Sequence, residues 1–254
     1  MAQAAEHGTG GKEIDPMHQF VVEPILDLHI AGFDASFTNA ALFMLIASGL
    51  IALLTIVGMS GRAMVPGRWQ SIVELSYEFV ADMVRQNIGS EGQKFFPFIF
   101  TLFMFILFCN MLGMVPYSFT VTSQIIVTFA IALFVILMVV TIGVMRHGFT
   151  FLEMFVPKGV PAILLPLLVL IEVISYLTRP ISLSVRLFAN MLAGHTMLKV
   201  FAYFVVGMGV LGGWAPLVFM VGLSALEVLV AFLQAYVFAV LTCIYLGEAI
   251  NMHH

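Results

Sequence analysis

A stretch of 51 residues, from Phe95 to Met145, contains no charged side chain. An α-helix rises about 1.5 Å per residue and the hydrocarbon core of a bilayer is about 30 Å thick, so one crossing needs about 20 apolar residues. The stretch is therefore about twice the length of one crossing. Gly113 and Pro116 interrupt it within "NMLGMVPYSFTVTSQ", which predicts a helical hairpin with helices at 95–114 and 121–145. A chain containing such a segment folds in a membrane.

The composition extends this conclusion to the whole chain. Of its 254 residues, 61% are hydrophobic and only 9% are charged, whereas about 25% are charged in a typical soluble domain. Apolar runs recur along nearly the whole length and leave no room for a separate soluble catalytic domain. We therefore expect a single membrane domain at 37–254, preceded by an exposed segment at 1–36. That segment is acidic with Lys12 as its one basic residue, unlike the cationic start of a signal peptide.

Four further segments have recognisable patterns. Residues 37–59 are free of charge and long enough for a first crossing. Residues 66–89 combine apolar positions at helical spacing with an acidic face, which predicts an amphipathic helix lying on the membrane surface, packed on a soluble partner, or both. The segments 163–206 and 214–247 would reach about 66 and 50 Å as helices. We expect both to be strongly tilted or bent, with Pro166 and Pro180 as candidate kink points.

Together these segments predict an all-α integral membrane protein with about five crossing helices and one interfacial helix, the last two crossings forming a long, tilted hairpin. Basic residues outside the crossings indicate the side that faces the cytoplasm. The links at 113–124 and 207–213 carry no charge, which places them and the N-terminus outside and the C-terminus inside. The basic residues of the other links are Arg62, Arg68, Arg85, Lys94, Arg146 and Lys158.

Several functional classes are not favoured by the sequence. The net charge is −4 and the ten basic residues are scattered, so we expect no nucleic-acid partner. Cys109 and Cys243 fall in separate apolar runs, which predicts packing roles. No phosphate-binding loop, serine-hydrolase motif or paired-cysteine motif is present, and the terminal "NMHH" has no third metal ligand at a suitable spacing. We expect no metal, no cofactor and no autonomous active site.

Charged residues inside the apolar runs require a reason, because each costs about 2.5 to 3.5 kcal/mol at the centre of a bilayer. Glu172, Arg179 and Arg186 are spaced by seven, which leaves each only about 20° from the last around a helix. Ser182 and Asn190, four positions before and after Arg186, extend this polar stripe.

A second stripe lies on the last long segment, where Glu227, Gln234 and Glu248 are separated by multiples of seven. Two polar stripes on neighbouring helices indicate a hydrated seam. His195 points about 180° away from Arg186 on an ideal helix, so it belongs to a different arrangement. A His195–Glu227 pair would titrate as a unit and could pass protons, or could be a purely structural hydrogen bond.

The other charges also have structural interpretations. Arg186 could form an internal salt bridge with Glu227 or Glu172, although Glu172 lies about 21 Å away along one helix. Arg179 could extend toward the membrane surface or bind backbone carbonyls. Lys199 could likewise extend to the surface or mark a helix end.

Three stretches point to one family. "RPISLSVRLFANMLAGH" (179–195), "LEVLVAFLQAYVFAVLTCIYL" (226–246) and "NMLGMVP" (110–116) closely resemble the a subunit of rotary F-type ATP synthases, especially alphaproteobacterial forms. The resemblance covers most of the chain. It implies a stator in a bacterial inner membrane, with two long tilted helices against a ring of c subunits that each carry a buried carboxylate. It also implies peripheral-stalk b-type subunits and lipid as neighbours, and H⁺ as the transported ion.

The resemblance further implies roles for individual residues. Arg186 matches the essential arginine of the family, a fixed cation that favours the ionised ring carboxylate and blocks direct passage between two half-channels. His195 and Glu227 match a pair that some relatives carry in exchanged positions, in the inlet half-channel through which protons enter. The other inlet residues are Asn190, Gln234 and Asn110, and those of the exit half-channel are Glu172 and Ser182.

Three alternatives remain at this stage. Asn110 could be a helix cap or turn residue. The chain could be a proton-coupled secondary transporter, although it shows neither an inverted repeat nor a pair of broken helices. It could also be a structural subunit of a respiratory complex, in which case Arg186 would tolerate neutral replacement.

Overall fold

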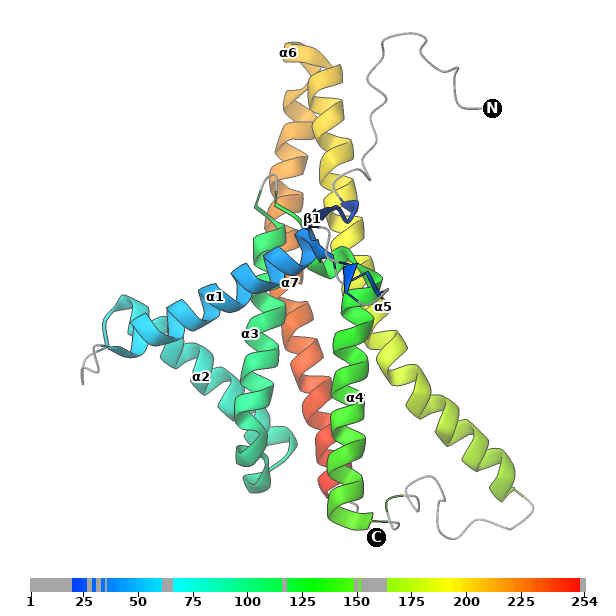
Figure 1. The fold of residues 1–254 in the computed structure, drawn as a ribbon. Helices are drawn as coiled ribbons and strands as arrows, with labels where there is room; N and C mark the ends of the chain where they lie inside the picture. The colour runs from blue at the N-terminus through cyan, green and yellow to red at the C-terminus, as the bar shows by residue number, and fades with distance from the viewer. Residues whose placement is uncertain are drawn as a thin grey trace.

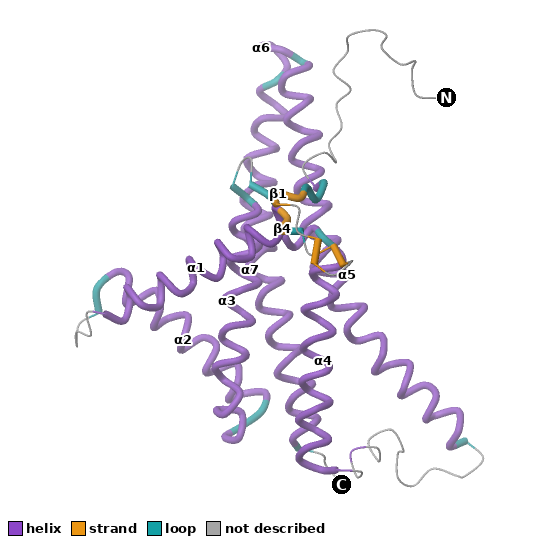
Figure 2. Tube along the Cα trace, viewed as in Figure 1, coloured by secondary structure: helices purple, strands orange, loops and turns teal. Residues whose placement is uncertain are grey.

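A computed structural model describes residues 20–26, 29–30, 33–34, 36–60, 66–115, 118–148, 151 and 164–251. Within these ranges the chain is dominated by long helices (Figure 2). Five helical segments are long and apolar enough to cross a membrane, and they have the predicted order along the chain. This confirms the predicted fold class. The long helices are α1 (Asn39–Ser60), α2 (Arg68–Asn87), α3 (Phe96–Gly113), α4 (Ile125–His147), α5 (Leu165–Gly207) and α7 (Trp214–Ile250).

The hairpin of α3 and α4 differs from the prediction at one helix start. Residues 121–123 form a 3₁₀ turn, η3 (Val121–Ser123), and α4 begins only at Ile125. The Ser123 hydroxyl donates to the Thr120 carbonyl at 2.6 Å. Such local side-chain bonds compete with the α-helix, which explains the later start of α4. A second 3₁₀ segment, η2 (Ser90–Phe95), joins α2 to α3.

The two longest helices form the predicted hairpin. α5 has 43 residues and α7 has 37, about 65 and 55 Å of helix, and the short α6 (Gly209–Gly212) lies between them. Both curve along their length, and α5 diverges from the other helices toward its N-terminal end (Figure 1). α1 projects at a steep angle to α3, α4 and α7. Because these helices do not share one direction, they cannot all stand upright in one bilayer. Some of them must therefore be tilted, which agrees with the tilt expected for the longest helices.

The two prolines of α5 have different roles. Pro180 lies inside the helix, where it removes a backbone hydrogen bond. Pro166 lies in the first turn of α5, where no intrahelical amide bond is needed. The prediction of Pro166 as a kink point is therefore wrong, because it marks the helix start.

The core lies where α3, α4, α5 and α7 meet, with one face of α2 added to it. α2 also leaves Trp69, Leu75 and Glu78 exposed, so its outer surface suits both lipid and a soluble partner. The largest fully buried side chains include Phe103, Ile106, Leu187 and Phe238.

Short strands precede α1, and the sequence analysis did not predict them. β1 (Pro24–Leu26) pairs antiparallel with β4 (Phe37–Thr38), and β2 (His29–Ile30) pairs with β3 (Phe33–Asp34). The adjoining segment is fixed to the helices by two side-chain amides. Asn39 Nδ2 donates to the Val21 carbonyl at 3.1 Å, and Gln124 Nε2 donates to the Phe20 carbonyl at 2.7 Å.

Candidate functional site

A histidine and a glutamate meet between the two longest helices. His195 on α5 and Glu227 on α7 are both buried, and His195 Nδ1 lies 3.3 Å from Glu227 Oε1. Gly194 makes this approach possible, because a Cβ at that position would lie 2.7 Å from the same carboxylate oxygen. The predicted contact between these residues is therefore present in the structure.

The opposite edge of the imidazole faces a residue that the sequence analysis did not single out. His195 Nε2 lies 3.2 Å from Thr120 Oγ1, in the link between α3 and η3. The Thr120 hydroxyl also donates to the Gly113 carbonyl at 3.3 Å. The only sequence signal was the group of hydroxyl residues in "SFTVTSQ", which is equally typical of an ordinary turn.

The Glu227 carboxylate is not held by a hydrogen-bond network. Both of its oxygens are buried, and apart from the 3.3 Å contact between Oε1 and His195 Nδ1 no hydrogen-bond partner reaches them within the described ranges. Most buried polar atoms do have partners, so such exceptions suggest a functional group. The contact with His195 fits both interpretations of the pair, proton transfer and a structural hydrogen bond.

Asn110 connects α3 to α7 beside this pair. Its Nδ2 donates to the Ala231 carbonyl at 3.1 Å, one helical turn after Glu227. Its Oδ1 is buried and has no partner among the residues described. Since Asn110 lies inside α3 and bonds to another helix, its interpretation as a cap or turn residue is wrong.

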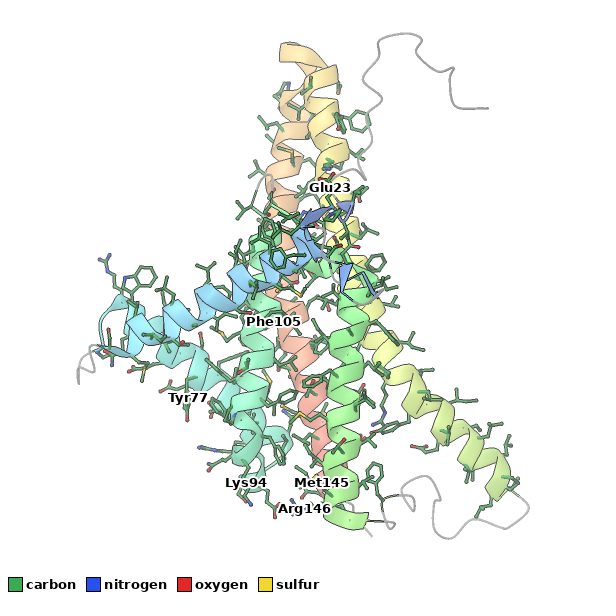
Figure 3. All side chains as sticks on the ribbon, in the orientation of Figure 1. Glu23, Tyr77, Lys94, Phe105, Met145 and Arg146 are labelled. Atoms are coloured by element: carbon green, nitrogen blue, oxygen red, sulfur yellow. The ribbon has the colours of Figure 1, made fainter. Side chains whose placement is uncertain are left out.

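A cavity of about 870 Å³ leads to His195. Phe20, in the segment before β1, packs against the His195 ring with ring centroids 6.4 Å apart. Lys199 lies inside α5, one turn after His195, with Nζ 5.9 Å from the Phe20 ring centroid, so it does not mark a helix end. Glu23, near the N-terminal strands (Figure 3), also lines the cavity. The other polar residues that line this cavity include Asn39, Ser118 and Ser224.

Arg186 lies outside this buried group. Its side chain is exposed, and no ion pair joins it to Glu172 or Glu227 in the described part of the chain. The internal salt-bridge interpretation is therefore wrong. One turn before and after Arg186 on α5, Ser182 and Ala189 are exposed as well. Arg186 is thus an exposed cation on the polar stripe of a helix that is long and apolar enough to cross a membrane.

The other residues of the two stripes differ in environment. Ser182 is exposed, whereas Asn190 and Glu172 are half-buried along the same helix. Gln234 is buried on α7, seven positions after Glu227. The structure thus brings His195, Glu227 and Asn110 to one place and leaves the Arg186 stripe on another face of α5.

Arg179 has a partner that the sequence analysis did not predict. Its Nη1 lies 2.7 Å from Glu248 Oε2, and its guanidinium lies over two aromatic rings, 4.9 Å from the Tyr176 centroid and 4.7 Å from the Tyr245 centroid. The expected surface-directed or carbonyl-bound arginine is wrong. The sequence analysis had placed Glu248 on the second polar stripe. It could not pair Glu248 with Arg179, because their relative position depends on how α5 packs against α7.

Metal binding gains no support from the described residues, among which no group of three His, Cys, Asp or Glu side chains could hold an ion. Cys109 and Cys243 are free and buried, as their predicted packing roles require. The predicted features at Arg62, Lys158, His253 and His254 lie outside the described ranges.

The fold and site define a class: a multi-pass helical membrane protein with a buried His–Glu pair and an exposed arginine on its longest helices. The family described as "ATP synthase A chain" matches residues 41–247. The ATP synthase subunit a of Parvibaculum lavamentivorans is 58% identical over 260 residues, covering 100% of both chains. The subunit a of Pelagibacter ubique is 57% identical, over 94% of this chain and 99% of its own length. That of Rhizobium meliloti is 60% identical, over 93% of this chain and 97% of its own length. The chain belongs to the ATP synthase A chain family, and is thus a multi-pass membrane subunit of an ATP synthase.

Proposed function

We propose that this chain is the proton-conducting stator subunit in the membrane sector of a rotary F-type ATP synthase. It offers protons an inlet half-channel and an exit half-channel, separated by Arg186, beside a ring of c subunits. Family membership supports the placement in an ATP synthase. The observation that carries the finer proposal is Arg186, an exposed cation on a membrane-crossing helix with no ion-pair partner among the described residues.

A cation on a lipid-facing surface is unfavourable by several kcal/mol unless a partner supplies an anion. A passing ring carboxylate is such an anion. Because the guanidinium of arginine stays protonated, it would favour the ionised carboxylate at every passage and could not relay a proton itself. Each proton that crosses 100 mV supplies about 2.3 kcal/mol, so a leak at this point would uncouple ion flow from ATP synthesis.

The inlet half-channel is assigned to the cavity that reaches His195. From that cavity a proton would pass to the His195–Glu227 pair, whose facing atoms are 3.3 Å apart. Asn110 lies beside the pair through its bond to Ala231. Gln234 and Asn190 then continue the route toward Arg186, since Gln234 shares the Glu227 face of α7 and Asn190 lies one turn from Arg186.

The exit half-channel is assigned to Glu172 and Ser182. Both follow the Arg186 stripe toward the N-terminal part of α5, which diverges from the other helices (Figure 1). Glu172 is half-buried and Ser182 is exposed, so both are within reach of a partner surface or of water.

Orientation and partners complete the proposal. Lys94 and Arg146 lie at the same end of the molecule (Figure 3), and basic residues concentrate on the cytoplasmic side. This end would face the cytoplasm, with the N-terminus outside and the C-terminus inside. The c ring would contact the outer face of α5 and α7, while peripheral-stalk b-type subunits and lipid would cover other surfaces.

The test is replacement of Arg186 in the assembled complex. Arg186→Ala should abolish both ATP synthesis and ATP-driven proton pumping in inverted membrane vesicles, because no fixed cation then faces the ring. Arg186→Lys should also be strongly impaired, since a lysine can lose its proton in a poorly hydrated site. Arg85→Ala, at an exposed position of α2, is the matched control and should leave both activities near wild type. Normal synthesis and pumping in Arg186→Ala would overturn the proposal and favour a purely structural subunit.

A further inference from the structure

We propose that Thr120 is a positioning residue that makes the His195–Glu227 pair a site for exactly one exchangeable proton. The inference rests on the proposed proton-conducting function and adds a residue to it. Thr120 is only 2% exposed, and its hydroxyl lies between the His195 ring and the end of α3. Its role follows from which partner can donate in each contact.

The contact with α3 fixes the direction of the hydroxyl proton. Gly113 is the last residue of α3, in the turn where helix carbonyls lack amide partners. A carbonyl oxygen can only accept, so in its 3.3 Å contact with Gly113 the Thr120 hydroxyl donates its single proton. Gly113 also lacks the side chain that would prevent this packing, because a Cβ there would lie 2.7 Å from Thr120 Cγ2.

The direction of the Thr120 hydroxyl proton determines which nitrogen of the His195 imidazole carries a hydrogen. With its proton directed to Gly113, Thr120 Oγ1 can only accept from His195 Nε2, 3.2 Å away. Nε2 therefore carries a hydrogen, and Nδ1 is the nitrogen that gains or loses a proton. Nδ1 is also the atom that faces Glu227 Oε1.

Two states then satisfy the pair. In one, a protonated Glu227 directs its O–H at the Nδ1 lone pair. In the other, that proton has moved to Nδ1, leaving an imidazolium and a carboxylate; one O–H bond breaks and one N–H bond forms. A neutral ring with an ionised carboxylate would place two acceptors against each other. Because Thr120 holds Nε2–H throughout, the transfer needs no rotation of the ring.

The first measurement is the tautomer of His195. The chain contains seven histidines, so ¹⁵N-histidine solid-state NMR would be recorded on the reconstituted membrane sector, with His195→Ala identifying the His195 signals by their loss. Wild type and Thr120→Ser, which retains a hydroxyl, should show Nε2–H. Thr120→Val, which has the same shape but no oxygen to accept from Nε2–H, should show a mixture with the Nδ1–H tautomer. An unchanged Nε2–H tautomer in Thr120→Val would overturn the inference.

The second measurement is passive proton conduction by the same preparations. Thr120→Val should conduct about fivefold less than wild type, the ratio that corresponds to one hydrogen bond of about 1 kcal/mol, and Thr120→Ser should recover most of the loss. Thr242→Val is the matched control, because Thr242 is buried on α7 but its hydroxyl bonds only to its own helix, at Phe238. It should conduct like wild type. If Thr120→Val does not assemble, Thr120→Ala lacks the same hydroxyl and must show the same tautomer shift.

His195→Ala separates this inference from the proposed function. If it conducts like wild type, the His195–Glu227 pair is not on the proton path and the proposed inlet fails. If it blocks conduction while Thr120→Val behaves like wild type in both measurements, the inlet stands and only the role of Thr120 is wrong.

Discussion

The contact between His195 and Glu227 depends on a position that carries no side chain. Gly194 precedes His195 on α5, and its Cα faces the Glu227 carboxylate. Since His195 Nδ1 is the one polar atom that faces this carboxylate among the described residues, the position of the carboxylate is set by packing against Gly194 and His195. A small steric change here should therefore alter proton transfer more than stability.

Gly194→Ala tests this expectation. The added methyl would lie 2.7 Å from Glu227 Oε1 and 3.2 Å from Cδ, so the carboxylate must move away from its present position. A displacement near 1 Å can cost up to about a hundredfold in a reacting geometry, and we expect proton conduction to fall by about 10- to 100-fold. Unfolding should change little, because the end of a flexible side chain can shift and alanine favours the helix.

Gly222→Ala is the control for this change, because an added Cβ at Gly222 on α7 meets nothing within 4 Å. Both variants would be compared for proton pumping in inverted vesicles and for thermal stability after purification. Equal pumping by the two variants would show that the tight packing at Gly194 is unimportant.

At the scale of residues, helical spacing predicted which polar groups share a face of a helix. It placed His195 away from Arg186, while the pairing of His195 with Glu227 came from their titratable side chains and the family resemblance, and that contact is present. It could not find Thr120, because that residue comes from a turn whose path depends on η3. Nor could it find the steric role of Gly194, since a glycine in a helix shows its purpose only once the opposing side chain is in place.

At the scale of elements, α5 and α7 are joined by two polar contacts. His195–Glu227 joins them toward the α6 end, and Arg179–Glu248 joins them further from it. Arg186 lies between Arg179 and His195 on α5, about 10 Å along the helix from Arg179. The two contacts therefore determine how α5 lies against α7 on either side of Arg186.

The Arg179–Glu248 contact should show measurable coupling. Arg179→Ala and Glu248→Ala should each lower the stability of the purified complex, and the double variant should lose less than the sum of the two. We expect a coupling of about 1 kcal/mol, because the Arg179 side chain is only 19% exposed and also lies over two aromatic rings. The measurement is a double-mutant cycle by denaturant unfolding in detergent.

The Glu91–Arg146 ion pair provides the comparison for this cycle. It joins η2 to α4, and its side chains are 47% and 39% exposed, so solvent screens it more strongly. Its coupling should be smaller, about 0.5 kcal/mol or less. Additive losses at Arg179 and Glu248 would mean that their contact does not stabilise the packing of α5 on α7.

The elements themselves were largely predictable, because apolar length and breaks in the pattern locate long helices directly. The start of α4 was not, since hydroxyl-to-backbone bonds near 120–123 replace its expected first turn. The short strands before α1 were also missed. They are only two or three residues long and are accompanied by bonds from Asn39 and Gln124, which no local pattern reveals.

At the scale of the whole molecule, apolar side chains cover the sides of the crossing helices, whereas basic side chains gather at one end. Large apolar side chains face outward along the crossing helices, as a lipid environment requires. Basic residues such as Lys94 and Arg146 gather at the end away from α6 (Figure 3). The steep angle of α1 was not predictable, because tilt depends on packing between helices rather than on the length of each apolar run.

This charge distribution predicts the orientation of the chain. Met208, beside α6, is 56% exposed, and Ser90 in η2 is exposed near the basic end. In intact cells or right-side-out vesicles, a membrane-impermeant maleimide should label Met208→Cys and spare Ser90→Cys. Inverted vesicles should give the reverse. The unsubstituted chain is the control, since Cys109 and Cys243 are buried and should stay unlabelled from both sides.

The orientation also decides which half-channel is which. The cavity at His195 is lined by Ala202 and Met220, toward the α6 end of the two long helices, so it opens outward only if α6 lies outside. In that orientation the proposed inlet would bring protons to the His195–Glu227 pair from the outer side, and Glu172 in the proposed exit would release them toward the cytoplasm. Labelling of Met208→Cys only in inverted vesicles would exchange the two assignments, while the separation by Arg186 would stand unchanged.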